Sequence, residues 1–236
     1  MTWMRQGIAQ SGFGRGILMK NQIQVQQSRK FGWLIDFIQD EARKFIIPIQ
    51  DIVELLPRSE YALDLGSGQG LLIEKMLYKV SRVTGVDYDK RKCDMARKRL
   101  SNYLNRVGIV ESDLISFLEN VDNSSIETII ISDTLASIPF EDQDKVLRMA
   151  LQKLKKDGLL LIKIMDLIPK WKAFLSRQVS NTIYKILKLS ISKDQRLCYQ
   201  SHLDYERKLR EFGADTKVVI MHKMFFPHVV ILARKL

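Results

Sequence analysis

The sequence predicts an α/β fold with a parallel sheet that is buried on both faces. Between residues 59 and 166, five short and nearly continuous apolar segments alternate with helical segments, which is the pattern that such a sheet requires. The first apolar segment runs into the glycine-rich turn Gly66–Gly70 and then directly into a helix. Two further apolar segments flank Phe225–His228 and indicate a β-hairpin at the end of the chain. We therefore expect one main domain over residues 59–236.

The composition limits the partners and the compartment. The 236 residues suffice for one domain with terminal additions, and the net charge of +11 favours an acidic partner such as RNA or an anionic membrane surface. Cys93 and Cys198 form no spaced cluster, so the sequence predicts neither a metal site nor a disulfide framework, and a cytoplasmic location fits. No apolar run approaches the roughly 20 residues of a membrane span, and we expect no integral membrane segment.

Two segments precede the first strand. Residues 1–20 contain four glycines among scattered polar residues and are predicted to form a flexible or docking N-terminal tail. Residues 21–58 are predicted to form extra N-terminal helices, because apolar residues recur at helical spacing up to Pro48, which begins a second short helix that Pro57 ends. We expect these helices to lie over a ligand cleft or to cover the edge of the sheet.

Strands and helices then alternate along the chain. Asp157-Gly158 is predicted to be a turn that leads into the fifth strand. The predicted strands are 61–65, 80–86, 107–111, 128–132 and 159–164, and the predicted helices are 71–77, 90–100 and 141–155. In parallel sheets of this kind, ligands bind beyond the carboxyl ends of the strands, near the point where the strand order reverses.

The last third of the chain is predicted to be a helical insertion over residues 169–212, followed by two strands. Pro169–Leu189 is amphipathic, and Ser201–Phe212 begins with a capping box and ends at Gly213. The first of these helices is expected to form a lid over a substrate site, with a basic outer face. Packing of this helix on the core is the equal alternative. The two strands are 218–221 and 229–233.

The spacing of the glycines indicates which ligand the turn binds. A dinucleotide fingerprint needs its third glycine five positions after the first, whereas this chain has Gly70 at the fourth position and Leu71 at the fifth. Asp64, two residues before Gly66, would repel a pyrophosphate and suits a cationic ligand group. An ordinary glycine turn in another α/β domain is the alternative reading.

The segment Asp64–Gly70 resembles motif I of the class I S-adenosylmethionine-dependent methyltransferases. The resemblance implies a Rossmann-like, seven-stranded, mostly parallel sheet with one antiparallel strand and with helices on both faces. It also implies that S-adenosyl-L-methionine is the cofactor and that the turn surrounds its methionine half. The residues implied for this part of the site are Asp64, Gly66, Ser67, Gly68 and Gly70.

Four further candidate cofactor contacts follow the second and third strands. Asp87 lies 21 residues after Gly66 at the end of the second strand, where a carboxylate can accept hydrogen bonds from a ribose diol. The resemblance implies that Tyr88 stacks on adenine, that Asp113 accepts from the adenine amino group and that Leu114 covers the ring. Asp113 is also placed to cap a short helix over 114–119, and this alternative stays open.

The candidate catalytic residues are Asp133, Lys163 and His228. The resemblance places Asp133 near the transferable methyl group, where it is also a candidate cofactor ligand. The sequence Ser132–Leu135 departs from the D/N-P-P-Y/F form that acts on exocyclic amines of bases and on glutamine amides. His202 and His228 are further candidates for a general base, because histidine titrates near neutral pH, and a structural role is open for each.

The expected function is methyl transfer from S-adenosylmethionine to a small-molecule or lipid-like acceptor. Met165-Asp166, Pro169–Trp171 and the segment 226–234 resemble methyltransferases of polyene and lipid biosynthesis. The alternative acceptor is RNA, at a ribose 2′-oxygen or a base. Ribose 2′-O methyltransferases that resemble a heat-shock-linked ribosomal RNA methyltransferase use a set of Lys, Asp, Lys and Glu residues. In this chain Asp133, Lys163 and Lys30 are candidates for three of them, but a glutamate for the fourth place is missing. A cofactor-binding module without catalysis is a third reading.

Overall fold

The computed structural model describes residues 48–168, 171, 197–221 and 227–236, all within the unit Pro48–Leu236. The predicted tail, the N-terminal helices up to residue 47 and the predicted lid helix Pro169–Leu189 therefore lie outside the described residues, apart from Trp171. Of the predicted N-terminal helices, the short second one is described as α2 (Ile49–Glu54), which Pro48 precedes. The domain boundaries at residues 20, 58 and 169 stay predictions.

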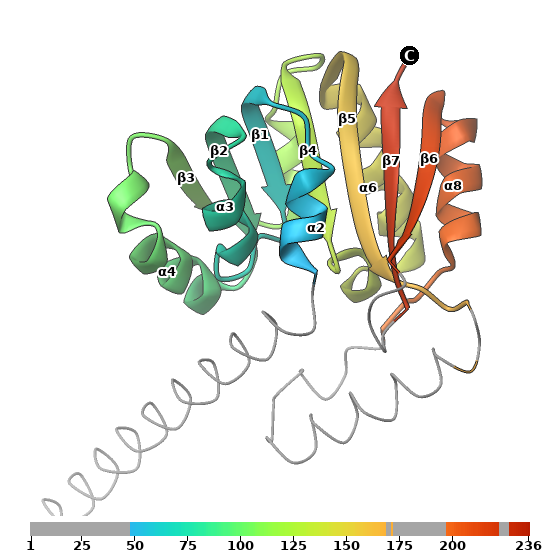
Figure 1. Cartoon of the computed structure of the whole chain (residues 1–236), viewed down its shortest axis with the longest axis horizontal. Coiled ribbons are helices and arrows are strands. Elements are labelled where there is room, and N and C mark those ends of the chain that lie inside the picture. The colour runs from blue at the N-terminus through green and yellow to red at the C-terminus, as the bar shows by residue number, and fades with distance from the viewer. Residues whose placement is uncertain (1–47, 169–170, 172–196, 222–226) are drawn as a thin grey trace, which may run out of the picture. The chain divides into compact units, whose positions relative to one another are not determined.

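A single seven-stranded sheet forms the centre of this unit, in the order β3-β2-β1-β4-β5-β7-β6 (Figure 1). The first five strands are parallel to one another, and β7 runs antiparallel between β5 and β6. This topology confirms the predicted sheet. The strands are β1 (Ser59–Leu65), β2 (Val80–Asp87), β3 (Val107–Glu111), β4 (Ile126–Ser132), β5 (Leu154–Met165), β6 (Ala214–Met221) and β7 (His228–Lys235).

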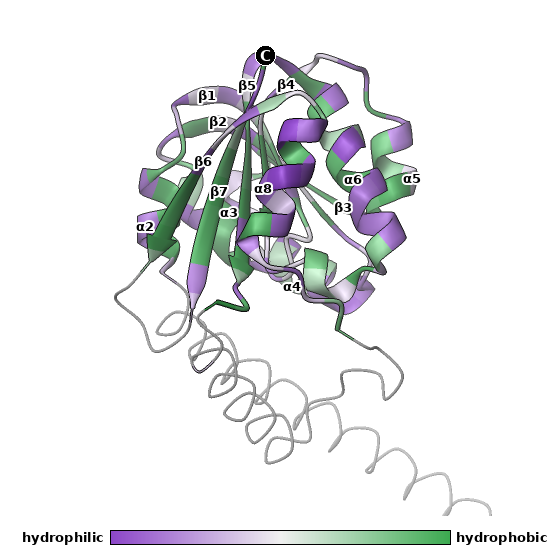
Figure 2. Ribbon diagram, turned by 90° about the vertical axis from the view of Figure 1, so that its right-hand side faces the viewer, coloured by the Kyte–Doolittle hydropathy of each residue, from purple (hydrophilic) through white to green (hydrophobic). Residues whose placement is uncertain are grey.

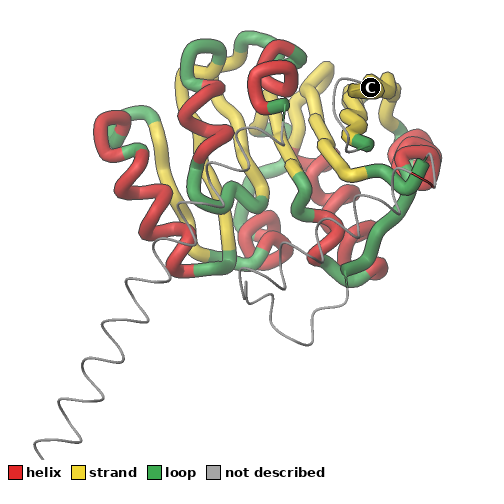
Figure 3. Tube along the Cα trace, turned by 60° about the horizontal axis from the view of Figure 1, so that its bottom comes forward, coloured by secondary structure: helices red, strands yellow, loops and turns green. Residues whose placement is uncertain are grey.

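Helices cover both faces of the sheet, as predicted (Figures 1 and 3). The chain moves outward from β1 to β3, then returns to β4 and moves the other way to β5. Because crossover connections are right-handed, the two directions place their helices on opposite faces. The helices after α2 are α3 (Leu71–Met76), α4 (Lys90–Arg99), α5 (Leu114–Glu119), α6 (Phe140–Lys153) and α8 (His202–Glu211).

The core lies along the two central strands and extends into the helices behind them. Ile129–Ile131 in β4 and Leu159–Ile162 in β5 are at most 2% exposed, because each strand has a neighbour on both sides and helices on both faces. This double burial explains why the apolar runs of the sequence are continuous instead of alternating. Figure 2 shows the apolar strands beside helices with hydrophilic outer faces. No helix in the described ranges is long and apolar enough to cross a membrane.

The start of β5 differs from the prediction. The strand already pairs at Leu154, opposite Ile126, and the register then shifts before Leu159 pairs with Thr128. Asp157, at a φ of 62°, lies inside this irregular stretch, so the predicted turn at Asp157-Gly158 is a bulge-like interruption of a longer strand. The neighbouring β4 offers backbone partners on both sides of the interruption, which local sequence preference does not reveal.

The C-terminal elements follow the prediction in order, but β6 begins at Ala214 and not at Val218, and His228 is placed differently. Ser201 and Asp204 form the predicted capping box of α8, and Gly213, at a φ of 86°, follows the end of the helix. His228 was expected in the hairpin turn, but it is the first residue of β7 and pairs with both Met165 and Met221. Strand β7 is longer than its apolar run, because it is sandwiched between β5 and β6.

Candidate functional site

The glycine-rich turn joins β1 to α3 and lies against the end of β2. Its three glycines have φ angles of 83°, 54° and 76°, in the left-handed region that glycine adopts without the steric cost of a Cβ atom. The backbone amides of Gly66 and Ser67 both donate to the Val86 carbonyl oxygen, over 2.7 and 3.0 Å. These bonds hold the turn at the carboxyl ends of β1 and β2.

Gly66 also allows the loop after β4 to approach the turn. A Cβ atom on Gly66 would lie only 2.0 Å from Thr134 Oγ1, so a larger residue does not fit without movement of the loop. Thr134 Oγ1 in turn lies 3.1 Å from the Ser132 carbonyl oxygen, to which it donates a hydrogen bond. Because the strand order reverses between β1 and β4, this contact marks the place where ligands of such sheets bind.

Asp64 is a buried carboxylate directly behind the turn. Its side chain is 2% exposed, and Oδ2 has no hydrogen-bond partner within the described part of the chain. Burial, followed by repulsion from Asp87, raises the pKa of Asp64 from 3.8 to about 7. A cationic group at this position would stabilise the charged carboxylate.

Two more buried oxygens of the turn lack partners. Ser67 Oγ and Gln69 Oε1 form no hydrogen bond to any described residue, although both side chains are buried. Buried polar atoms are normally paired, so a cluster of three unsatisfied oxygens in one turn indicates a place for a polar ligand. The sequence pointed to Ser67 only through the resemblance, and it did not single out Gln69.

Asp87 fastens the turn to the end of β2. Its Oδ2 accepts a hydrogen bond of 2.9 Å from the Gly68 amide, and its Oδ1 accepts one of 2.9 Å from the Asp89 amide. A carboxylate offers about four lone-pair sites. Asp87 therefore supports the turn and still has acceptor capacity for the ribose hydroxyls that the sequence assigns to it.

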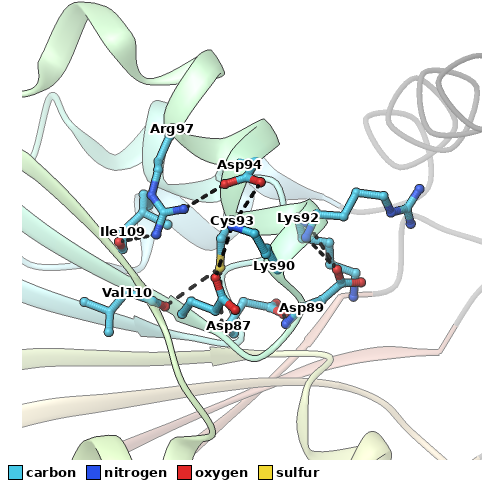
Figure 4. Close-up of polar contacts among 11 residues, drawn as sticks. Asp87, Asp89, Lys90, Lys92, Cys93, Asp94, Arg97, Ile109 and Val110 are labelled. Atoms are coloured by element: carbon cyan, nitrogen blue, oxygen red, sulfur yellow. Dashed lines mark hydrogen bonds and ion pairs between the residues drawn. The ribbon is translucent and has the colours of Figure 1, made fainter. Parts of the chain in front are cut away.

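Cys93 packs beneath Asp87 and is fully buried. The thiol donates to the Asp87 carbonyl oxygen over 3.3 Å, and burial, with the nearby Asp87 charge, raises its pKa (Figure 4). A raised pKa disfavours the thiolate, which is the nucleophilic form of cysteine. This environment therefore disfavours a nucleophilic role for Cys93.

The predicted adenine contacts lie at the ends of β2 and β3. The Tyr88 ring is 63% exposed, with Lys92 Nζ 6.0 Å from the ring centroid. Asp113 Oδ1 accepts from the Ser116 amide over 2.9 Å, so Asp113 does cap α5, as the alternative reading held. The Ser112 amide donates to the Asp87 carbonyl oxygen over 3.1 Å, which joins the two strand ends. The adenine roles of Tyr88, Asp113 and Leu114 stay predictions.

Asp133 and Lys163 form an ion pair at the ends of β4 and β5. The Lys163 ammonium contacts Asp133 Oδ2, and the Asp133 amide donates to the Lys163 carbonyl oxygen over 2.8 Å. Lys163 is 1% exposed, whereas the Asp133 side chain is 36% exposed. Asp133 also has a φ of 57°, which is unusual for a residue with a side chain and is typical of functional sites.

The two candidate histidines differ in their surroundings. His228 is 1% exposed at the start of β7. His202 is the first residue of α8, and its Nδ1 lies 2.6 Å from Oδ2 of Asp166, which directly follows β5. The sequence named His202 as a candidate but did not pair it with Asp166, which lies 36 residues earlier. Within the described ranges, no three His, Cys, Asp or Glu side chains are placed to bind a metal ion.

A buried glutamine that sequence reasoning missed holds the segment before His202 in place. Gln143 Nε2 in α6 lies within 2.8–2.9 Å of the carbonyl oxygens of Leu135, Ile138 and Cys198. Its Oε1 accepts from Gln200 and Tyr205. Gln143 thus ties the loop after β4 to the start of α8, and only the tertiary contacts distinguish it from an ordinary polar helix residue.

Comparison with known families and structures agrees with this site. Residues 62–158 match the family model described as a methyltransferase domain. No curated protein sequence matches the chain. The matched segment includes the glycine-rich turn, Asp87, Asp113 and Asp133, and it ends inside β5.

Three solved structures illustrate the likeness of the fold. An O-methyltransferase family protein from Burkholderia thailandensis has a TM-score of 0.68 at 17% identity, over 89% of this chain and 62% of that one. A SAM-dependent methyltransferase from Archaeoglobus fulgidus has a TM-score of 0.60 at 13% identity, over 85% and 94%. The YcgJ protein from Bacillus subtilis has a TM-score of 0.60 at 12% identity, over 79% and 97%. At these identities the likeness concerns the fold.

Proposed function

We propose that the chain transfers a methyl group from S-adenosylmethionine to a small-molecule or lipid-like acceptor. The premise is that residues 62–158 match the family model of a methyltransferase domain. The observation that carries the choice of acceptor is the charge of the described residues. Of the 38 Lys and Arg residues, 15 lie outside the described ranges, and of the 27 Asp and Glu residues, 4 do. The described residues therefore contain 23 basic and 23 acidic side chains, so the net charge of +11 belongs entirely to the other segments.

The described residues carry no net charge that would favour RNA, and the basic excess of the unit Pro48–Leu236 lies outside them, in residues 169–196 and at position 223. Binding to nucleic acid depends mainly on Lys and Arg contacts with phosphates, which require a basic stripe or patch on the domain. The most basic described element is α4, but several of its cations are paired with acids: Lys90 with Glu111, Arg99 with Glu74, and Arg97 with Asp94. Figure 4 shows the pair of Arg97 and Asp94. These pairs favour a substrate that enters the cleft over a polyanion that spans the surface.

The cosubstrate fits the polar groups at the glycine-rich turn. S-adenosylmethionine carries an ammonium and a sulfonium, and Asp64 offers a buried carboxylate oxygen with no partner among the described residues. We assign Asp64 and the turn to the methionine half and Asp87 to the ribose. Tyr88, Asp113 and Leu114 are assigned to adenine. Each assignment uses an atom that this fold places at the carboxyl ends of the strands.

The chain's contribution to the transfer is alignment and charge. The sulfonium supplies a methyl group that is already activated for displacement, so the protein must chiefly hold the acceptor atom in line with it. Asp133, at the end of β4, is proposed to face this region, and its charge is balanced by Lys163. A buried ammonium that fixes a carboxylate in one direction suits a positioning role for Lys163.

The proposal is tested by following the methyl group. The full chain is incubated with tritiated S-adenosylmethionine in three separate reactions. The first contains a lipid extract, the second a polar small-molecule extract and the third total RNA. We expect label in the organic-soluble fraction, or in an acid-soluble product that chromatography separates from S-adenosylmethionine. Acid-insoluble label that ribonuclease releases would reassign the acceptor to RNA. Failure of S-adenosylhomocysteine to bind in calorimetry would contradict the methyltransferase assignment itself.

A further inference from the structure

We propose that His202 is the general base of the reaction, that Asp166 positions it, and that the acceptor is consequently a hydroxyl group. This inference rests on the proposed methyl transfer and narrows its substrate class. It starts from a pair of residues that lie 36 positions apart in sequence and meet beyond the end of β5.

The Asp166 carboxylate acts only as an acceptor in this arrangement. Its side chain is 2% exposed, and Oδ1 accepts from the backbone amides of Leu167 and His202, over 2.8 and 3.0 Å. Oδ2 lies 2.6 Å from His202 Nδ1. A carboxylate that accepts three hydrogen bonds requires Nδ1 to carry the hydrogen, so in the neutral imidazole the lone pair is on Nε2.

His202 Nε2 is the ring atom left for a ligand. The His202 side chain is 13% exposed, so it is largely enclosed and still accessible. No described residue forms a hydrogen bond with Nε2, whereas Nδ1 and the backbone amide are both bound to Asp166. An oriented imidazole whose second nitrogen is accessible is the usual form of a histidine base.

The pair lies at the same edge of the sheet as the glycine-rich turn. Strands β1, β4 and β5 are adjacent and parallel, so Leu65, Ser132 and Met165 end at one edge, which is turned toward the viewer in Figure 3. The start of α8 is anchored to this edge from two sides. The His202 amide donates to Asp166 Oδ1 at the end of β5 over 3.0 Å, and the Cys198 amide donates to the Ala136 carbonyl oxygen after β4 over 2.8 Å.

The step that this geometry supports is methylation of an O–H group. The acceptor oxygen forms a bond to the methyl carbon as the carbon–sulfur bond breaks, and that bond pair stays on sulfur, which becomes a neutral thioether. The acceptor proton passes to His202 Nε2, and the imidazolium is stabilised by Asp166 until the proton leaves to solvent. A base is needed because a hydroxyl at neutral pH is protonated, unlike a carboxylate.

An electrophilic cofactor analogue tests the placement without knowledge of the acceptor. Adenosine with an aziridine ring at the 5′ position extends a reactive two-carbon arm past the methyl position, toward the place of the acceptor oxygen. We expect peptide mass spectrometry to find the adduct on His202, with loss of that adduct in His202→Gln and protection by S-adenosylhomocysteine. An adduct on another side chain, or none although the analogue displaces S-adenosylhomocysteine, would overturn the inference while leaving the methyltransferase assignment intact.

Asp166 is tested through its effect on the ring. Asp166→Asn retains the size of the side chain but can donate to Nδ1, which favours the tautomer with hydrogen on Nε2. We expect alkylation of His202 to slow by about tenfold or more, with unchanged S-adenosylhomocysteine affinity, and nitrogen-15 NMR to report the change of tautomer. Arg207→Gln, in the exposed part of the same helix, serves as the control and should label like the wild type. Equal labelling rates in Asp166→Asn and wild type would refute the positioning role.

Discussion

The ammonium of Lys163 in β5 contacts the carboxylate of Asp133 at the end of β4, beside the glycine-rich turn. The pairing register places Lys163 opposite Ser132, one residue before Asp133. A lysine inside the apolar run Leu159–Met165 is therefore explained by a partner at the end of β4. The contact supports a charge-balancing and positioning role for Lys163.

Removal of Lys163 should affect stability more than cofactor binding. Lys163→Ala removes a buried stem and one partner of the ion pair, and we expect the free energy of unfolding to fall by about 3 kcal/mol. Urea denaturation measures this change, and Lys156→Ala, at an exposed position, should change it by less than about 0.5 kcal/mol. Full stability together with lost turnover on RNA would instead favour the ribose methyltransferase mechanism.

Asp64 should make the stability of the protein depend on pH. Its pKa is raised in the folded state from 3.8 to about 7, so between these values the unfolded chain loses the proton while the folded protein retains it. The free energy of unfolding should thus fall by on the order of 4 kcal/mol as the pH rises from about 4 to about 7, and it should stay level above that. Urea denaturation of wild type and Asp64→Asn across this range measures the difference, and parallel curves would contradict the prediction.

The same carboxylate should make cofactor affinity depend on pH in the opposite direction. Binding of the ammonium of S-adenosylmethionine requires charged Asp64, so affinity should increase as the pH rises to about 7 and should level off above it. Calorimetry at several pH values tests this, and Asp64→Asn should bind weakly and without that dependence. An affinity that falls over the same range would show that Asp64 does not face the cation.

Asp87 and Asp89 form a matched pair of substitutions. Asp87→Ala removes the acceptor for the ribose and also the bond to the Gly68 amide, and hydrogen bonds to charged groups are worth about 1.5–3 kcal/mol each. We expect S-adenosylhomocysteine affinity to fall by about tenfold or more. Asp89→Ala removes only the N-cap of α4 and should cost about 1 kcal/mol of stability without that loss. Similar affinities of the two variants would contradict the ribose assignment.

The basic charge outside the described residues should determine association with anionic surfaces. We expect the full chain to float with anionic vesicles. A variant in which glutamate replaces Lys170, Arg177 and Lys188 should bind these vesicles more weakly. Neutral vesicles are the control. If the chain does not bind vesicles but retains RNA in a salt-sensitive way, and the same variant loses that retention, the basic face of the predicted helix Pro169–Leu189 would be assigned to RNA. If the chain binds neither, only packing of this predicted helix on the core would remain.

How much of the site the sequence predicts depends on how local each feature is. The glycine-rich turn, Asp64, Asp87 and Asp133 were located from the chain alone, because glycine spacing and acids at strand ends are set within a few residues. The capping box of α8 is equally local, since Ser201 and Asp204 bond to each other within one helical turn. The lengths of β5 and β7 were not predicted, because they depend on hydrogen bonds offered by neighbouring strands.

The sequence by itself determined the order of strands and helices, the class of the ligand turn and the acids available to it. Periodicity and glycine spacing are properties of adjacent residues and need no knowledge of the final packing. Only the tertiary structure decided which distant side chains meet: Lys163 with Asp133, Gln143 with the segment before α8, and Asp166 with His202. These pairs lie 30, 55 and 36 residues apart, and they form because parallel strands bring their carboxyl ends to one edge of the sheet.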